Sequence, residues 1–164
     1  MKYTFCPTCG QRLNARPLGD DGLVPWCDGC DRPWFDSFAT CIIVALINKD
    51  GEILLQREAR RPDREVLLAG YMQPGETAEV AALREIREET GLTVEDLRYQ
   101  GSYYHSGGDL LMLAFSAHAN GPARSTSTEI ISARWATPED AISVLREGSI
   151  AQQLVMTVQN NTTA

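Results

Sequence analysis

Two pairs of cysteines near the start of the chain constrain its fold more than any other feature. Cys6 and Cys9 form one pair, Cys27 and Cys30 form the other, and 17 residues separate the two pairs. A tight turn in each pair can direct both sulfurs at one ion, and this spacing is typical of a four-thiolate zinc site. So short a segment buries too little apolar surface to fold alone, whereas zinc binding can supply the missing free energy. The sequence therefore predicts a small zinc ribbon over residues 1–36.

Four protein ligands would close such an ion to water and substrate, so the predicted zinc is structural. The alternatives are two disulfides or redox-active dithiols, which fit a cytosolic chain less well because neither pair starts a strand-to-helix unit. Residues 1–36 carry four basic and five acidic side chains. They lack the basic stripe that phosphate binding needs, so nucleic acid is not an expected partner of this segment.

The length and charge of the chain limit its class further. Its 164 residues suffice for a small module and one compact domain. Fifteen Lys and Arg against 22 Asp and Glu leave a net charge of -7, which disfavours a nucleic-acid binder and suits a protein that collects cations. The N-terminus lacks a signal peptide, and the longest apolar run, residues 41–47, is too short for a bilayer. We expect a cytoplasmic protein without a membrane partner.

Residues 37–164 have the pattern of an α/β domain with a mixed sheet. The run at 41–47 predicts a strand buried on both faces, and Asp50-Gly51 predicts a hairpin turn. The charged segment 58–65 is interpreted as a loop whose arginines either contact substrate phosphates or, as the simpler alternative, face solvent. In chain order we expect strands at 41–47, 52–56 and 66–68, a helix at 77–90 capped by Gly91, strands at 97–104, 110–118 and 130–135, a helix from 138 that Gly148 ends, and a helix at 150–158 before a frayed tail.

The helix at 77–90 carries the most informative side chains. On a helical wheel Val80, Leu83 and Ile86 form an apolar face, and the opposite face carries Glu85, Glu88, Glu89 and the alanines at 78, 81 and 82. Like charges at this spacing repel unless a cation compensates them, and the alanines are interpreted as room for an ion. Carboxylates suit a hard cation such as Mg²⁺ or Mn²⁺. The alternative is a solvated acidic face.

The residues around this helix distinguish the two interpretations. Gly70, five residues, Glu76, seven residues, Arg84-Glu85-Ile86, one residue, Glu88-Glu89, one residue and Gly91-Leu92 reproduce every fixed position of the Nudix box. The chain therefore resembles the Nudix hydrolases. The resemblance implies an α/β/α sandwich that hydrolyses nucleoside diphosphates linked to another group, with a divalent metal as cofactor.

The resemblance also implies roles for individual residues. Glu88 and Glu89 would bind the magnesium or manganese ion with help from the Gly70 carbonyl, and Glu85 would be a further ligand or the base that activates water. Arg84 and Glu76 would hold the helix and the loop in place. Glu129, which precedes a predicted strand, is the candidate for a further acidic ligand from a later loop.

A four-cysteine module before the box resembles the NADH pyrophosphatase (NAD diphosphatase) branch of the family. Residues 68–76 and 129–135 resemble that branch as well. The chain departs from it at 101–109, Gly-Ser-Tyr-Tyr-His-Ser-Gly-Gly-Asp, where the branch has a Ser-Gln-Pro-Trp-Pro-Phe-Pro-x-Ser array. The resemblance thus implies a pyrophosphatase acting on a dinucleotide such as NAD(H) or on ADP-ribose, with the choice of substrate left open.

Five residues are candidates for substrate binding, with packing as the alternative for those at the strand end: Tyr71, Gln73, Tyr103, Tyr104 and His105. The rival hypothesis is a Nudix-derived nucleotide-sensing regulator whose zinc ribbon is an interaction module. Such a sensor would not need three glutamates on one helix, so the enzyme is favoured. A homodimer is plausible for a small Nudix domain with an appended zinc module.

Overall fold

The chain divides into two compact units, residues 1–38 and 39–164, and the computed structural model describes residues 3–162. In the first unit, β1 (Asn14–Pro17), a 3-10 turn (Gly19–Asp21), β2 (Leu23–Cys27) and β3 (Arg32–Pro33) form an antiparallel sheet in the order β1-β2-β3. Its buried apolar cluster is small and consists of Cys6, Leu13 and Cys27. So little burial cannot stabilise a fold alone, which makes the cysteines the main source of cohesion in this unit.

The second unit is built on a six-stranded sheet. Its strands are β4 (Ala39–Ile47), β5 (Ile53–Glu58), β6 (Leu68–Tyr71), β7 (Val94–His105), β8 (Leu110–Ala119) and β9 (Ile130–Ala136). They follow the order β7-β8-β4-β5-β9, and β6 pairs with β4 outside this path. The pair of β4 and β8 is parallel and the other pairs are antiparallel. The predicted mixed sheet is therefore confirmed.

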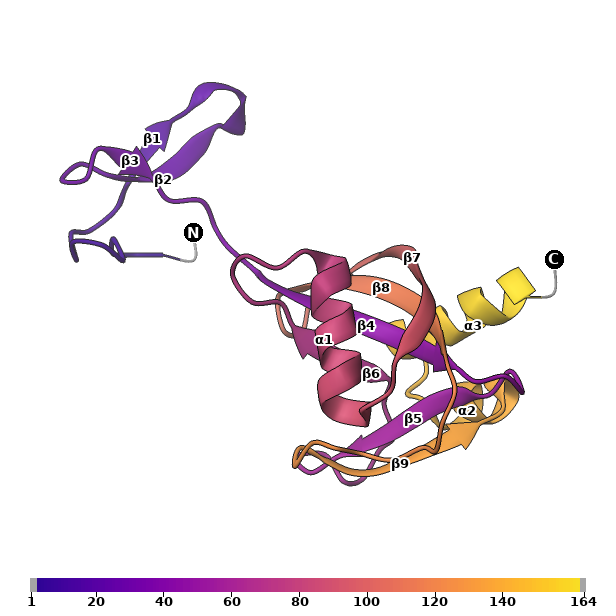
Figure 1. The fold of residues 1–164 in the computed structure, drawn as a ribbon. Helices are drawn as coiled ribbons and strands as arrows, with labels where there is room; N and C mark the ends of the chain where they lie inside the picture. The colour runs from indigo at the N-terminus through magenta and orange to yellow at the C-terminus, as the bar shows by residue number, and fades with distance from the viewer. Residues whose placement is uncertain (1–2, 163–164) are drawn as a thin grey trace. The chain divides into compact units, whose positions relative to one another are not determined.

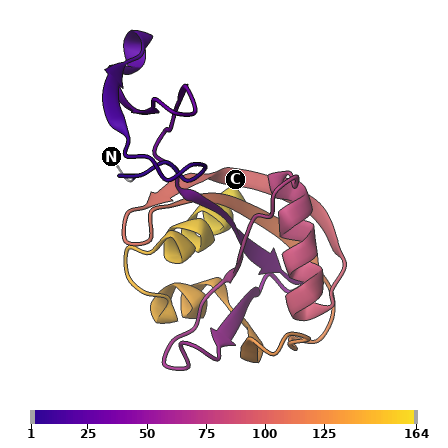
Figure 2. The same ribbon diagram turned by 90° about the vertical axis from the view of Figure 1, so that its left-hand side faces the viewer.

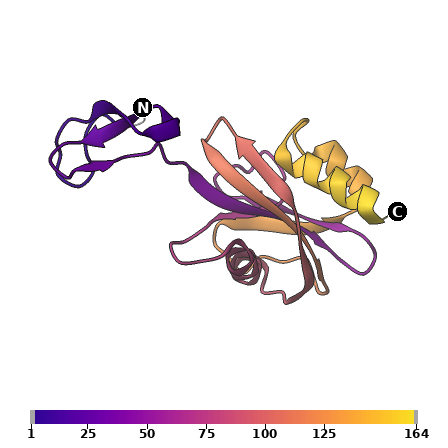
Figure 3. The same ribbon diagram turned by 90° about the horizontal axis from the view of Figure 1, so that it is seen from above.

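Helices cover both faces of this sheet. One face is covered by α1 (Ala78–Thr90), and the other by α2 (Pro138–Val144) and α3 (Ile150–Thr162), as Figures 1, 2 and 3 show. Residues of β4 alternate between the two resulting cores: Ile42 and Val44 pack on the side of α1, whereas Ile43 and Ala45 pack on the side of α3. A strand that supplies both cores is apolar throughout, as the run at 41–47 predicts. The α/β/α sandwich is thus confirmed.

The ends of α1 agree with the sequence. The Thr77 hydroxyl accepts a hydrogen bond from the backbone N–H of Val80, and Gly91 adopts the left-handed conformation with φ 67° and donates to the Arg87 carbonyl. The packed face of α1 differs from the wheel, however. Ala81 and Ala82 are fully buried, whereas Val80 is 51% and Leu83 45% exposed.

The interpretation of the alanines as room for an ion is therefore wrong. Together with Ile86, Ala81 and Ala82 form the face of α1 that packs on the sheet. Small side chains allow close approach of the helix, and this gain in contact outweighs burial of the larger residues at positions 80 and 83. The close approach also brings the glutamates of α1 near the strands.

Three further boundaries differ from the prediction. The β6 strand starts at Leu68, because its pairing with β4 covers residues 68–71 and Val66 makes only an isolated bridge with Gln56. The α2 helix ends at Val144, since Leu145 turns into the core in an extended conformation. The α3 helix continues beyond residue 158 to residue 162, and the rest of the predicted frayed tail, 163–164, lies outside the described residues. Within residues 3–162 no helix is long and apolar enough to cross a membrane.

Candidate functional site

A cavity of about 750 Å³ opens beside the C-terminal half of α1. Its walls come from the end of β5, from β6 and the loop after it, from α1, from the β7–β8 hairpin and from the loop before β9. Its volume lies within the range of about 300–1,000 Å³ that is common for small-molecule sites. All of its lining residues belong to the second unit.

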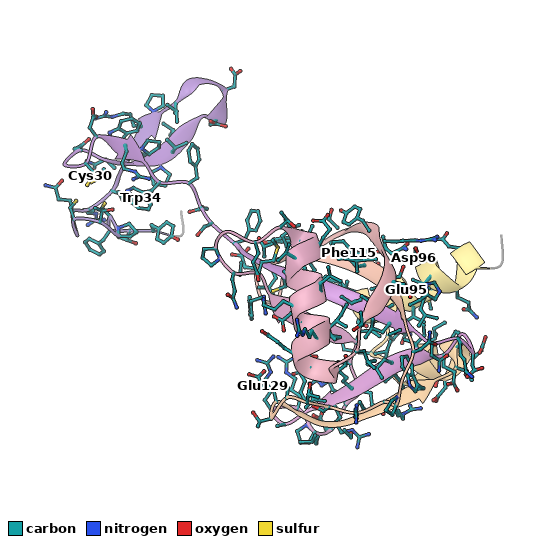
Figure 4. The ribbon with its side chains drawn as sticks, viewed as in Figure 1. Cys30, Trp34, Glu95, Asp96, Phe115 and Glu129 are labelled. Carbon is teal, nitrogen blue, oxygen red and sulfur yellow. The ribbon has the colours of Figure 1, made fainter. Side chains whose placement is uncertain are left out.

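Five carboxylates line this cavity. Glu85, Glu88 and Glu89 come from α1, Glu58 ends β5, and Glu129 precedes β9. Figure 4 shows Glu129 near the end of α1 that is more distant from the first unit's label Cys30 in the view. The fold thus gathers acidic groups from three separate segments of the chain. Without a cation their mutual repulsion would oppose this arrangement.

Glu89 shows the strongest electrostatic perturbation of the five. Burial raises the pKa of its carboxyl to about 7, against a lowering contribution from Gln56, and the charges of Glu85, Glu58 and Glu129 raise it further. Its Oε2 is buried, and no group in the described part of the chain donates a hydrogen bond to it. A buried oxygen without a donor, surrounded by other carboxylates, fits a hard divalent cation. These residues therefore suit Mg²⁺ or Mn²⁺.

Arg84 connects the carboxylates of α1 to the loop that follows β6. Its Nε lies 2.6 Å from Oε1 of Glu76, and its Nη1 donates to Glu85 at 2.7 Å and to Glu88 at 3.1 Å. Its Nη2 donates to the Tyr71 carbonyl at 3.1 Å. Only 19% of the Arg84 side chain is exposed. This guanidinium thus orients Glu85 and Glu88 toward the cavity and fixes the loop at the same time.

Glu76 forms the other half of this contact. Its carboxylate accepts from Arg84 and from the backbone N–H of Gln73. These two interactions, Arg84 first, hold the pKa of Glu76 at about 2. Glu76 is therefore ionised at any physiological pH and serves as a fixed partner of Arg84.

Gly70 has a steric reason to be glycine. A Cβ at this position would lie 2.1 Å from Cδ of Glu85. The Glu85 carboxylate therefore lies against the β6 backbone, where any other residue would displace it. The contact also brings the backbone of Gly70 into the wall of the cavity.

The loop before β9 is attached to the end of α1. The backbone N–H of Thr126 donates to the Glu89 carbonyl at 2.9 Å, and its hydroxyl donates to the Glu88 carbonyl at 2.6 Å. Two carbonyls of the last helical turn are satisfied in this way. These bonds also hold the segment that carries Ser127 and Glu129 beside the glutamates of α1.

The predicted substrate-binding residues separate into two groups. Tyr71, Gln73 and His105 line the cavity. Tyr103 instead packs against the core on the side of α3, and Tyr104 is 61% exposed and donates from its hydroxyl to Asp109. Residues 103 and 104 alternate between the two faces of β7, and neither is in the cavity wall.

Several lining residues were not predicted as site residues. Glu58 was assigned to a solvated loop, but β5 continues through it, and its side chain is only 18% exposed. Arg60 and Arg61 also line the cavity, so two of the arginines weighed for phosphate contact reach it. Arg60 donates from Nε to Glu58 at 2.9 Å. A longer strand in the prediction would have shown Leu54, Gln56 and Glu58 on one face.

The four cysteines of the first unit form a separate cluster. Their sulfurs all lie within 4.8 Å of one another, with 3.9 Å between Cys6 and Cys30 and 3.4 Å between Cys9 and Cys27. Tetrahedral zinc with Zn–S bonds of about 2.3 Å requires sulfurs roughly 3.8 Å apart, whereas a disulfide requires about 2.05 Å. The cysteines are free thiols, and their arrangement could hold zinc.

The backbone around this cluster also suits a metal. Burial by itself would raise the pKa of Cys6, but the backbone N–H groups of Cys9 and Thr8 donate to its sulfur and lower that pKa to about 6. A thiolate is the form that binds zinc. Trp34 and Cys30, both labelled in Figure 4, belong to the same side-chain cluster.

Comparisons with known proteins agree with this geometry. The NUDIX domain family matches residues 37–157. NAD-capped RNA hydrolase NudC of Vibrio atlanticus is 32% identical over 152 residues, which cover 92% of this chain and 55% of the relative. NudC of Vibrio vulnificus is 33% identical over 153 residues, covering 92% and 57%. The chain thus spans little more than half the length of these relatives.

Solved structures show the same fold. A NUDIX hydrolase from Nitrosomonas europaea aligns with a TM-score of 0.77 and 20% identity over 99% of this chain and 94% of its own. The NUDIX domain of Shewanella oneidensis NrtR, complexed with ADP ribose, aligns with a TM-score of 0.67 and 15% identity over 78% and 90%. At these identities the likeness concerns the fold alone.

Proposed function

The chain belongs to the Nudix family, and on this premise we propose that it is a divalent-metal-dependent pyrophosphohydrolase acting on a nucleoside diphosphate conjugate. The observation that carries this proposal is the set of five carboxylates in one cavity, among which Glu89 has a buried oxygen without a hydrogen-bond donor. A bound Mg²⁺ or Mn²⁺ would supply Lewis acidity to the pyrophosphate oxygens. A binding protein without chemistry would gain nothing from this concentration of like charge.

We assign metal binding to Glu88, Glu89 and the Gly70 carbonyl, with Glu129 as the acidic ligand from the later loop. Glu85 is either a third ligand or the base that accepts the proton of the attacking water. Arg84 is a positioning residue, because it donates to both Glu85 and Glu88 and leaves them directed at the cavity. The reaction forms a bond from water oxygen to a phosphorus of the pyrophosphate and breaks the bridging P–O bond.

The arginines of the cavity suit the anionic substrate. The side chain of Arg60 contacts Glu58 through Nε, so its terminal nitrogens face the cavity region beside Glu129 and Tyr71, whose charges it feels. Arg61 lines the same wall. We propose that these guanidinium groups bind phosphate oxygens and that Tyr71, 57% exposed, stacks on a base. Gln73 and His105 complete the wall.

We propose a dinucleotide such as NAD(H), or ADP-ribose, as the substrate class. The similarity to NudC over 92% of the chain supports a dinucleotide, and the cavity volume of about 750 Å³ accommodates one with part of it in solvent. The missing proline and tryptophan array at 101–109 argues for recognition through other residues than in the NADH pyrophosphatase branch. Because its relatives are named for NAD-capped RNA, a capped oligonucleotide belongs in the test as well.

The decisive experiment incubates the purified protein and Mg²⁺ with NADH, NAD, ADP-ribose, FAD, coenzyme A and a 5′-NAD-capped RNA, with chromatography of the products. We expect release of a mononucleotide from at least one of them and its loss in Glu88→Gln. Retained nucleotide binding without hydrolysis of any of them would refute the enzyme and favour a nucleotide sensor. Mn²⁺ titration of Glu85→Gln separates the two roles of Glu85, since loss of a ligand weakens binding and loss of a base lowers only kcat.

For the first unit we propose one structural Zn²⁺ at the cysteine cluster. Four thiolates fill the coordination of the ion, so it has no open position for substrate. The homodimer remains a prediction. The unit exposes Phe5, Leu23, Phe35 and Phe38, and sedimentation of the full chain at several concentrations tests whether it associates.

A further inference from the structure

Gln56 lies where the apolar core under α1 meets the acidic cavity. It is 1% exposed on β5, and its backbone is paired with Val66 on one side and with Ala133 of β9 on the other. Side chains two residues apart share a face of a strand, so Gln56 follows Leu54 and precedes Glu58 on the side of α1. This row changes from a core leucine through a buried amide to a carboxylate of the cavity wall.

The amide of Gln56 and the carboxylate of Glu89 have complementary needs. Within residues 3–162, Nε2 of Gln56 is buried and makes no hydrogen bond of good geometry, and the same is true of Oε2 of Glu89. The two side chains nevertheless lie close enough to interact electrostatically. A buried amide that lacks a partner destabilises a fold. A leucine or methionine would fill this position at less cost, so the amide has a role other than packing.

We propose that Gln56 is a positioning residue that orients the Glu89 carboxylate for the divalent cation. This inference rests on the metal site of the proposed function. The N–H groups of the amide hold one oxygen of Glu89 and leave the other for the ion. Because β5 is paired on both sides at this residue, the amide is fixed by the rigid centre of the sheet and not by a loop. Such outer contacts fix the direction of a ligand and tune its affinity for the metal.

The test is Mn²⁺ binding to the full, zinc-loaded chain, followed by electron paramagnetic resonance. Gln56→Met keeps the volume and removes both donors. We expect the Kd for Mn²⁺ to rise about 10–100-fold, while the thermal unfolding midpoint without Mn²⁺ is unchanged or higher. The matched control is Leu54→Met on the same face of β5, which should bind Mn²⁺ as the wild type does. An unchanged Kd in a folded Gln56→Met variant would overturn the proposal.

A kinetic measurement separates positioning from general damage. If Gln56 acts through metal affinity, saturating Mn²⁺ restores the kcat of Gln56→Met, whereas a distorted site stays slow at any Mn²⁺ concentration. Should the methionine variant not fold, Gln56→Asn keeps an amide but shortens its reach, and it should weaken Mn²⁺ binding in the same way. An asparagine variant with wild-type binding would then overturn the proposal.

Failure of this inference is distinguishable from failure of the proposed function. If the wild type hydrolyses none of the conjugates but Gln56→Met still weakens Mn²⁺ binding, the enzyme assignment fails and the positioning role stands. If hydrolysis is found and Mn²⁺ binding does not depend on Gln56, the reverse holds.

Discussion

The backbone of Gly70 and the carboxylate of Glu85 are in such close contact that a methyl group on residue 70 would lie 2.1 Å from the Glu85 Cδ. Gly70→Ala is therefore expected to displace Glu85 from the cavity wall. The overpacked contact should lower the free energy of unfolding by about 1–3 kcal/mol. Hydrolysis should fall more steeply than stability, because Glu85 moves away from the reacting atoms. Urea unfolding and steady-state kinetics of the same preparation measure both effects.

The double variant Gly70→Ala/Glu85→Ala is the control for that contact. With the long side chain removed, the added methyl group has nothing to clash with, so its cost in stability should largely disappear. An equal cost of Gly70→Ala with and without Glu85 would mean that residue 70 is constrained by something other than this side chain.

Glu88→Gln should remove hydrolysis while leaving the fold intact. The substitution keeps the size of the side chain but loses a negative charge that we assign to the cation. We expect kcat to fall by about 10²–10³-fold or more, the range for loss of one electrostatic contact at a reacting centre. Glu95→Gln, at an exposed position of β7, is the matched control and should keep full activity. Comparable losses in both variants would contradict the assignment.

The pair of Glu76 and Arg84 should contribute to stability in a pH-dependent way. The folded chain holds the pKa of Glu76 at about 2, below its usual 4.5. A lowered pKa means that the contribution is fully present above pH 4.5 and is lost as the pH falls from 4.5 toward 2. Glu76→Gln should therefore destabilise the protein at pH 7 and make a smaller difference at pH 3. Urea unfolding at the two pH values measures this, and equal differences would exclude the mechanism.

Removal of zinc should unfold the first unit and spare the chemistry of the second. We expect about one zinc per chain by elemental analysis, and release of it by a chelator should make residues 1–38 sensitive to protease. After Mg²⁺ is restored, residues 39–164 should still hydrolyse substrate, since the cavity is lined by that unit alone. Cys27→Ser is the genetic equivalent. A zinc-free but protease-resistant first unit would contradict a structural role.

The packed face of α1 can be tested with two neighbouring residues. Leu83 is 45% exposed and Ala82 is fully buried. Leu83→Gln should therefore change the free energy of unfolding by no more than about 0.5 kcal/mol, whereas Ala82→Leu should lower it by about 1–3 kcal/mol through overpacking. The opposite ranking, measured by chemical denaturation, would restore the wheel with Leu83 at its centre.

The sequence by itself determined the features that depend on neighbouring residues. The spacing of Cys6 and Cys9 in one turn, the caps of α1 at Thr77 and Gly91, and the apolar run of β4 are local, so propensity and periodicity were sufficient to predict them. The carboxylates of α1 also belong to this group, because they lie within one helix. The order of the elements in the sheet followed from the family resemblance.

Only the tertiary structure decided which distant residues join those carboxylates and which side of α1 is buried. Glu58 and Gln56 reach the cavity because β5 continues two residues beyond its predicted end, and Tyr103 is excluded by the direction of its side chain on β7. The wheel could not anticipate that Ala82 would pack closer than Leu83, since hydropathy describes one residue and close approach depends on the shape of two surfaces. The site is thus encoded locally in its charges and decided at long range in its geometry.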